Sequence, residues 1–187
     1  MKCSIRLKLI AGFSAALPLM AIMGVVSFYS ISSLVDASAN ADHTYQVIDG
    51  LERMVSRLKD AETGQRGFII TGEDRYLEPF STGIAGVERE LRDVRALTYD
   101  NPFQQKKLDI IEPLIQLRME KLTEAIKLRR EVGLESALGK ISQWDSGKHV
   151  MDALLSQAAA MEAEERRLLE DRADKTASTG ATAKMTI

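Results

Sequence analysis

Charged and polar side chains interrupt an apolar helical seam within the stretch DAETGQRGFIITG, residues 60–72. Apolar residues at steps of three and four keep one face of a helix toward its neighbours, and the face that contains Leu58 and Ile69 also contains Glu62 and Gln65. A charge buried in such a seam is tolerated only when it is paired. The chemistry that these residues offer is therefore ion pairing and hydrogen bonding inside a helical bundle.

A matching interruption occurs in a later helix, where Arg118 stands in an apolar stripe between Ile115 and Leu122. At ~1.5 Å per residue along each helix, Glu62 and Arg118 lie at about the same height in a bundle. We predict a polar layer here, formed by Glu62, Gln65, Arg66 and Arg118. This layer either takes part in signalling or only sets the register of the helices, and the sequence leaves both interpretations open.

Two glycines accompany this layer, although glycine costs about 1 kcal/mol relative to alanine inside a helix. Gly64 and Gly67 are explained if a neighbouring helix or loop approaches their backbone closely. Glu165 also interrupts an apolar stripe, that of the last helix, but it is expected several turns away from Arg66 along the bundle. No pair between Glu165 and Arg66 is predicted.

Sequence patterns of catalysis and of cofactor or metal binding are missing. His43 and His149 have no histidine or cysteine at metal-ligand spacing, and no phosphate-binding loop or nucleophile motif occurs. The single cysteine, Cys3, excludes an internal disulfide. A net charge of −2, with basic and acidic residues interleaved, argues against nucleic-acid binding. We expect neither an enzyme nor a protein that needs a metal or another cofactor.

An uncharged run of residues, 9–35, is long enough to cross a bilayer core, which needs roughly 20 apolar residues. Lys2, Arg6 and Lys8 precede this run and acidic residues follow it, so the positive-inside rule places the N-terminus in the cytoplasm. A cleaved signal peptide is the alternative, but its apolar region would be about twice the usual length. We therefore favour a membrane anchor, with the remaining chain in the periplasm or outside the cell.

Glycines and prolines divide the exported part into helices, with no alternating strand pattern. The predicted helices cover residues 36–71, 74–98 and 102–132, followed by one or two turns and a last helix from about 146 to 177. Short connections between long helices are typical of an up-down-up-down bundle. The predicted fold class is all-α, an N-terminal transmembrane helix followed by a four-helix bundle.

The predicted domain organisation has four segments. They are a cytoplasmic N-terminus (1–8), a transmembrane helix (9–35), the four-helix bundle (36–176) and a segment that leads toward a second transmembrane helix (177–187).

One helix of the bundle has a second apolar face, formed by Ile110, Leu114 and Leu117. A second face requires a second partner. A homodimer contact is one explanation and cover by another helix of the same bundle is the other, with a slight preference for the dimer.

Several motifs occur in a characteristic order, namely DAETGQRGFIITGEDRYLEPF, LTYDNPFQQKKLD, LRREVGLESAL, SGKHVMD and EAEERRLLEDR. With these motifs the chain resembles CHASE sensor domains of the third type. The resemblance covers about residues 45–172. Its most recognisable motif corresponds here to Asp60, Glu62, Thr63, Gly64, Gln65, Arg66 and Gly67.

The resemblance implies an extracytoplasmic input module that feeds a histidine kinase, a cyclase or a chemotaxis-type output, in a two-component or related signalling system. We expect a stimulus to be transmitted by displacement of the first and last helices relative to each other. Residues 1–187 contain neither a second span nor an output domain, so an anchored adaptor or structural bundle is the alternative. The resemblance identifies no ligand, whether a small molecule or a protein.

Overall fold

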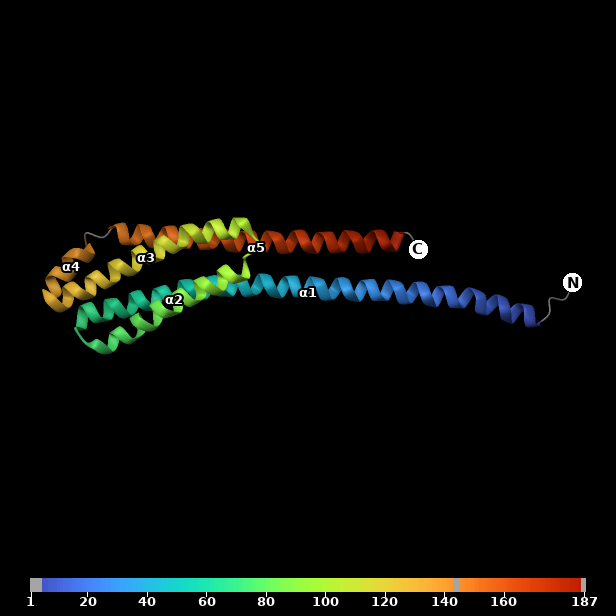
Figure 1. The fold of residues 1–187 in the computed structure, drawn as a ribbon, viewed down its shortest axis with the longest axis horizontal. Helices are drawn as coiled ribbons and strands as arrows, with labels where there is room; N and C mark the ends of the chain where they lie inside the picture. The colour runs from blue at the N-terminus through green and yellow to red at the C-terminus, as the bar shows by residue number, and fades with distance from the viewer. Residues whose placement is uncertain (1–4, 143–144, 186–187) are drawn as a thin grey trace. The chain divides into compact units, whose positions relative to one another are not determined.

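The computed structural model describes residues 5–142 and 145–185, and within these residues the chain is helical without a β-strand (Figure 1). The elements are α1 (Ile5–Thr71), a short 3-10 helix η1 (Asp74–Tyr76), α2 (Leu77–Leu97), α3 (Pro102–Glu131), α4 (Leu134–Ser142) and α5 (Asp145–Met185). The all-α prediction is confirmed. The short α4 is the one or two turns expected between the third and last helices.

The chain separates into two compact units, of which the larger is His43–Leu168. The other consists of the N-terminal part of α1 up to Asp42 and the C-terminal part of α5 from Leu169. The larger unit lies inside the predicted bundle of residues 36–176, whose exact bounds stay a prediction.

α1 contains a segment that is apolar and long enough to cross a membrane, by length and composition. Its side chains in that segment are not buried by the rest of the protein. This supports a membrane anchor in α1, and the bounds predicted for the span, residues 9–35, stay a prediction.

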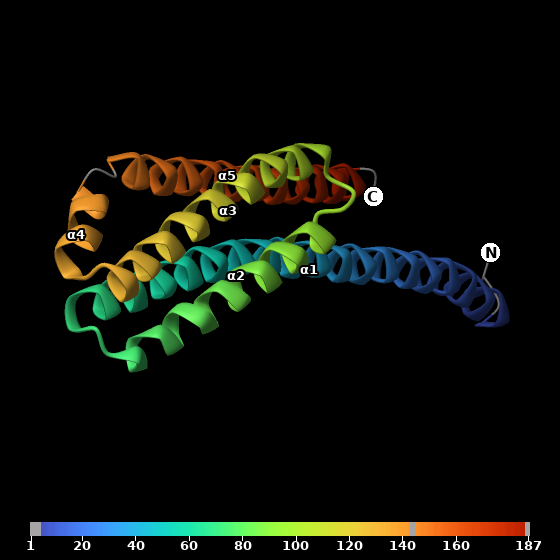
Figure 2. The same cartoon turned by 60° about the vertical axis from the view of Figure 1, so that its left-hand side comes forward.

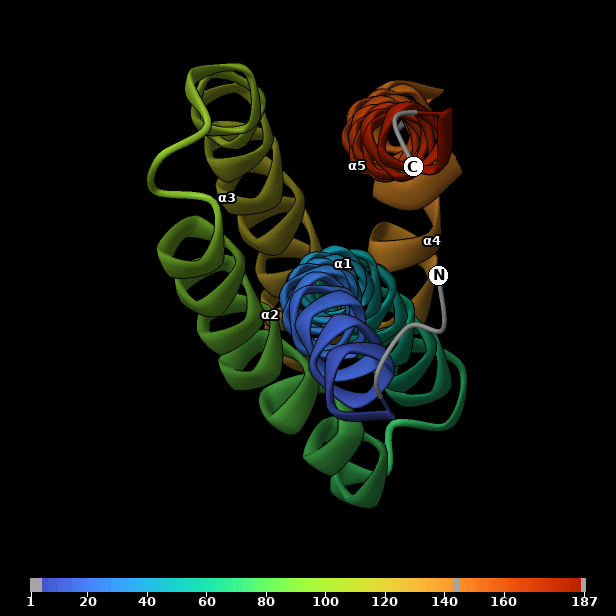
Figure 3. The ribbon, with the colours of Figure 1, turned by 90° about the vertical axis from the view of Figure 1, so that its right-hand side faces the viewer.

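Within His43–Leu168 the long helices alternate in direction, as an up-down-up-down bundle requires (Figures 1 and 2). A view along the helices shows α2 and α3 on one side of α1 and α4 and α5 on the other (Figure 3). α4 connects the end of α3 to the start of α5.

Local sequence explains where the helices end. The Asn101 side chain accepts hydrogen bonds from the backbone N–H groups of Phe103 and Gln104, and Pro102 occupies the first helical position. Gly72 follows α1 with φ = +73°, a conformation that glycine adopts without strain. These two boundaries were predicted.

The start of α2 differs from the prediction, which placed a regular helix from Asp74 onward. An α-helix from Asp74 would require the backbone N–H of residue 79 to bond to the carbonyl of Arg75. Residue 79 is proline, which has no N–H to donate. The chain therefore forms η1 first, and α2 begins at Leu77 with Pro79 in its first turn.

The last helix is also longer than predicted, since α5 continues to Met185 where the predicted helix ended near residue 177.

The buried apolar side chains form two clusters at different heights. The main cluster contains Val47, Leu51, Met54 and Leu58 of α1, with side chains from α2, α3 and α5. The second lies farther along α1 and α3 and contains Phe68, Ile69, Ala125, Ile126 and Ala137. The bundle core is thus apolar in two blocks with a break between them.

The second apolar face of α3 is only partly covered. Leu114 packs against the main cluster, as expected if the bundle itself covers this face. Ile110 and Leu117 are exposed. A homodimer contact at these two residues stays a prediction.

Close packing explains the glycines of the predicted polar segment. A Cβ atom at Gly64 would stand 2.7 Å from the carbonyl oxygen of Tyr76 and 2.8 Å from the backbone nitrogen of Phe80. A Cβ atom at Gly67 would meet the Tyr76 ring. Since both obstacles at Gly64 are backbone atoms, they yield less readily than a side chain.

We predict that Gly64→Ala lowers the free energy of unfolding by about 1–3 kcal/mol, because the overpacking cost exceeds the gain in helix propensity. The measurement is urea denaturation followed by circular dichroism. Gly139→Ala in α4 is the control, since no atom of another element lies within 4 Å of the corresponding Cβ position. Equal effects of the two substitutions would contradict the close approach at Gly64.

Candidate functional site

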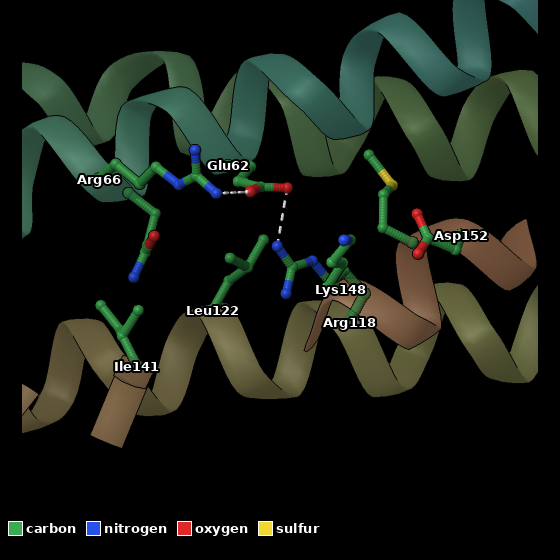
Figure 4. Close-up of a pocket in the computed structure, with 9 residues that line it drawn as sticks. Glu62, Arg66, Arg118, Leu122, Ile141, Lys148 and Asp152 are labelled. Carbon is green, nitrogen blue, oxygen red and sulfur yellow. Dashed lines mark ion pairs between the residues drawn. The ribbon is translucent and has the colours of Figure 1, made fainter. Parts of the chain in front are cut away.

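The structure brings Glu62 and Arg118 together in the interior of the bundle. The Arg118 guanidinium donates to Glu62 with Nη2 2.7 Å from Oε2, and the Arg118 side chain is 8% exposed. Arg66, one turn along α1, binds the other oxygen of Glu62 at 2.5 Å, but its side chain is 68% exposed (Figure 4). Glu62 therefore forms ion pairs with two cations, one buried and one at the surface.

This ion pair occupies the break between the two apolar clusters. Along α1, Glu62 follows Leu58 of the main cluster and precedes Phe68 of the second. Along α3, Arg118 follows Ile115 and precedes Ala125 in the same way. The polar layer thus lies between the two apolar clusters, and the buried apolar side chains of Ala61 and Leu122 accompany it.

Two nitrogen atoms of the layer are buried without an acceptor among the described residues. They are Nε2 of Gln65, whose residue is 2% exposed, and Nε of Arg118. Leaving a buried donor unpaired costs about 1–3 kcal/mol. The charges of Glu62 and Arg118 are thus paired, but two hydrogen-bond donors of the layer have no acceptor among the described residues.

A cavity of about 290 Å³ adjoins the layer. Its polar lining consists of Glu62, Gln65, Arg66, Arg118, Lys148 and Asp152. Leu122, Ile141 and Met151 form its apolar wall. In Figure 4 the Arg118 guanidinium lies between Glu62 of α1 on one side and Lys148 and Asp152 of α5 on the other.

The cavity residues of α4 and α5 were not predicted from the sequence. Ile141, Lys148 and Asp152 belong to short or charged segments whose pattern does not distinguish a cavity wall from a solvated face. The packing of α4 and α5 against the other helices places them at the layer.

The motif predicted from the resemblance divides between two faces of α1. Glu62, Gln65 and Arg66 face the cavity. Asp60 and Thr63 are exposed and line a different depression between α1 and α2, which also includes Arg57 and Glu78. Gly64 and Gly67 contact the η1 and α2 region. The motif thus combines a polar layer with a close helix contact.

A second buried polar group lies near the α2–α3 turn and was not predicted. Glu165 of α5 is 2% exposed. It accepts hydrogen bonds from Nε2 of Gln104 at 2.8 Å and from Oγ1 of Thr44 at 3.3 Å. These bonds join α1, α3 and α5. The interruption of the α5 stripe by Glu165 was visible in the sequence, but nothing in the sequence identified Gln104 or Thr44 as its partner.

Ion pairs at the surface shift two pKa values. The hydrogen bond from Arg53 to Glu90, together with the charges of Glu90 and Asp49, raises the pKa of the Arg53 guanidinium. The hydrogen bond from Arg167 lowers the pKa of the Glu164 carboxyl. Both shifts favour the charged forms of Arg53 and Glu164. The first pair joins α1 to α2, and the second lies within α5.

Among residues 5–142 and 145–185, no three histidine, cysteine, aspartate or glutamate side chains gather as metal ligands would.

Comparison with known proteins gives one family and one similar structure. The family model of the CHASE3 domain matches residues 37–175. The crystal structure of the Rhodopseudomonas palustris histidine kinase HK9 sensor domain is similar with a TM-score of 0.62 and 23% identity, over 68% of this chain and 98% of that chain. The search of curated proteins finds no significant match. The structural likeness shows a shared helical fold.

We predict that Glu62→Ala lowers the free energy of unfolding by about 3–5 kcal/mol, because it leaves the buried Arg118 charge without its carboxylate. Arg66→Ala should cost only about 0.5 kcal/mol or less, since that pair is exposed. The double variant Glu62→Met with Arg118→Met, which replaces the pair by apolar side chains of similar size, should restore stability to within about 1 kcal/mol. The measurement is urea denaturation of each variant.

Additive losses in the double variant would show that Glu62 and Arg118 do not depend on each other.

Proposed function

We propose that this chain, which belongs to the CHASE3 domain family and is the extracytoplasmic sensory input module of a signalling receptor, transmits its stimulus as a displacement of α5 relative to α1. α1 and α5 are the two helices that continue beyond the compact unit His43–Leu168. α2, α3 and α4 lie within it. A change inside the bundle therefore reaches the rest of the receptor through α1 and α5.

The observation that carries this proposal is the cavity at the polar layer. Glu62 and Gln65 of α1 and Arg118 of α3 line one part of it, and Lys148, Met151 and Asp152 of α5 line another. Protein interiors are otherwise close-packed, so a cavity beside a helix leaves that helix room for a second packing. A stimulus that fills or closes this space favours one packing over the other.

The polar layer supplies the energetic difference between two such packings. The buried Arg118 guanidinium has its carboxylate on α1, while the cavity beside it is lined by a cation and a carboxylate of α5, Lys148 and Asp152. A shift of α5 changes the distances of these two charges from Arg118 and Glu62. Lys148 and Asp152 are exposed, so solvent screens them, whereas Arg118 and Glu62 are largely shielded from water. A bias of the size of an ordinary allosteric coupling then comes mainly from any change at the Arg118–Glu62 pair.

The proposed topology follows the sequence. Residues 9–35 cross the membrane with the N-terminus in the cytoplasm, and the bundle lies in the periplasm or outside the cell. α5 leads toward a second span and a histidine kinase, cyclase or chemotaxis-type output. In this scheme the chain is an input module without catalysis of its own, and a homodimer uses the face of Ile110 and Leu117.

The test uses a receptor in which this chain precedes a histidine-kinase output in its membrane. The variant is the double substitution Glu62→Met with Arg118→Met, because it removes the charges while keeping the bundle folded. We expect the basal autophosphorylation rate to change by at least about fivefold, the size of a typical allosteric coupling. Single alanine variants at Glu62 and Arg118 should also change the output.

The control is Arg95→Ala, which removes the ion pairs from Arg95 to Asp109 and Glu112 between α2 and α3. This variant should keep the basal rate. A double variant that is folded and has the same kinase activity as the unchanged receptor would remove the polar layer from the mechanism.

A further inference from the structure

The cavity at the polar layer has the properties of a binding site for a small molecule. Its volume of about 290 Å³ lies just below the ~300–1,000 Å³ that ligand pockets usually have, so it suits only a small molecule. Polar groups converge on one part of it, and apolar side chains form the remainder. This division into a polar and an apolar part restricts the chemistry of the molecule that fits.

The polar part offers donors whose acceptors are missing. Nε2 of Gln65 and Nε of Arg118 are both buried at the cavity without an acceptor in the described part of the chain. Native proteins rarely leave such groups unpaired. Each of these atoms has almost no accessible surface itself, so an acceptor in the cavity reaches it only when the Gln65 or Arg118 side chain turns toward the cavity.

The charges around the cavity favour an anion. Arg66, Arg118 and Lys148 contribute three positive charges, and Glu62 and Asp152 contribute two negative charges. Glu62 is already bound by Arg66 and Arg118. One positive charge therefore remains, and a single carboxylate would balance it.

The apolar wall distinguishes an organic acid from an inorganic anion. Leu122, Ile141 and Met151 would contact a hydrocarbon portion, whereas a phosphate ion would leave them facing a hydrated group. The cavity is too small for a long acyl chain in addition to a carboxylate.

We propose that this cavity binds a small monocarboxylate with a short apolar body. The carboxylate accepts hydrogen bonds from Gln65 and Arg118, and the apolar body packs against Leu122, Ile141 and Met151. This proposal rests on the proposed function, since the bound acid is then the stimulus that sets the position of α5.

The experiment is isothermal titration calorimetry of the full chain in lipid nanodiscs with propionate, butyrate, valerate and hexanoate. Empty nanodiscs correct for partition into lipid. Affinity should increase by about fourfold for each methylene until the cavity is filled, since each buried methylene contributes ~0.8 kcal/mol. Pentanamide, which lacks the charge of valerate, should bind at least about tenfold more weakly.

The decisive variant is Gln65→Met, which keeps the side-chain size and removes the unpaired donor. It should weaken binding of the best carboxylate at least about tenfold. Its thermal unfolding midpoint should stay equal to that of the unchanged chain or rise, because a buried unsatisfied group is removed. A purely structural role of Gln65 would not separate binding from stability in this way.

Gln116→Met is the matched control, because Gln116 is an exposed glutamine of α3 outside the cavity lining. It should leave the affinity unchanged.

Three results would overturn the proposal. The first is that none of the four acids binds at about 10 mM, far above the range of ordinary ligand affinities. The second is that the Gln65→Met variant binds the best acid with the same affinity as the unchanged chain. The third is that phosphate binds more tightly than the acids. A chain that binds no acid while its Glu62→Met, Arg118→Met variant still changes kinase output would refute the ligand class alone. If the unchanged chain binds an acid but the double variant leaves the kinase output unchanged, the proposed function is refuted instead.

Discussion

A guanidinium group that has lost almost all contact with water must have a carboxylate beside it, and the Arg118 side chain is in this position. Glu62 supplies the carboxylate from α1, so this ion pair joins α1 and α3 at one height. Apolar side chains alone tolerate sliding by a helical turn, because leucine, isoleucine and valine exchange places at little cost. We expect the charge pair to favour the observed alignment of the bundle over alignments shifted by a turn.

Much of this arrangement could be predicted from the sequence, because the determining signals are local. The cap at Asn101 and the glycine at residue 72 act within a few residues of their own backbone. The contact between Glu62 and Arg118 was predicted from the rise per residue along two helices whose ends are marked by turns in the sequence. It needed no knowledge of α5. The roles of these residues in signalling remain a proposal.

The part that could not be predicted depends on contacts across long sequence separations. Glu165 is 61 residues from Gln104 and 121 from Thr44. The sequence shows that Glu165 interrupts an apolar stripe, but at such separations it does not identify Gln104 and Thr44 as the partners. The cavity residues Lys148 and Asp152 are placed by the direction in which α5 leaves α4. The start of α2 differs because of a local feature. Pro79 has no N–H to donate, and this prevents a regular helix from Asp74 onward.

The division of the core into two apolar blocks has a consequence for how the bundle unfolds. The block of Phe68, Ile69, Ala125, Ile126 and Ala137 includes small side chains and sits where α1, α3 and α4 end or begin. It buries less apolar surface than the main block, and the polar layer interrupts continuous packing between them. Stability in proteins is distributed in such cooperative units, and the weaker unit opens at a lower free energy than the whole molecule. We therefore expect the tip of the bundle to open as a unit of its own, with its amide hydrogens exchanging while the main block remains folded.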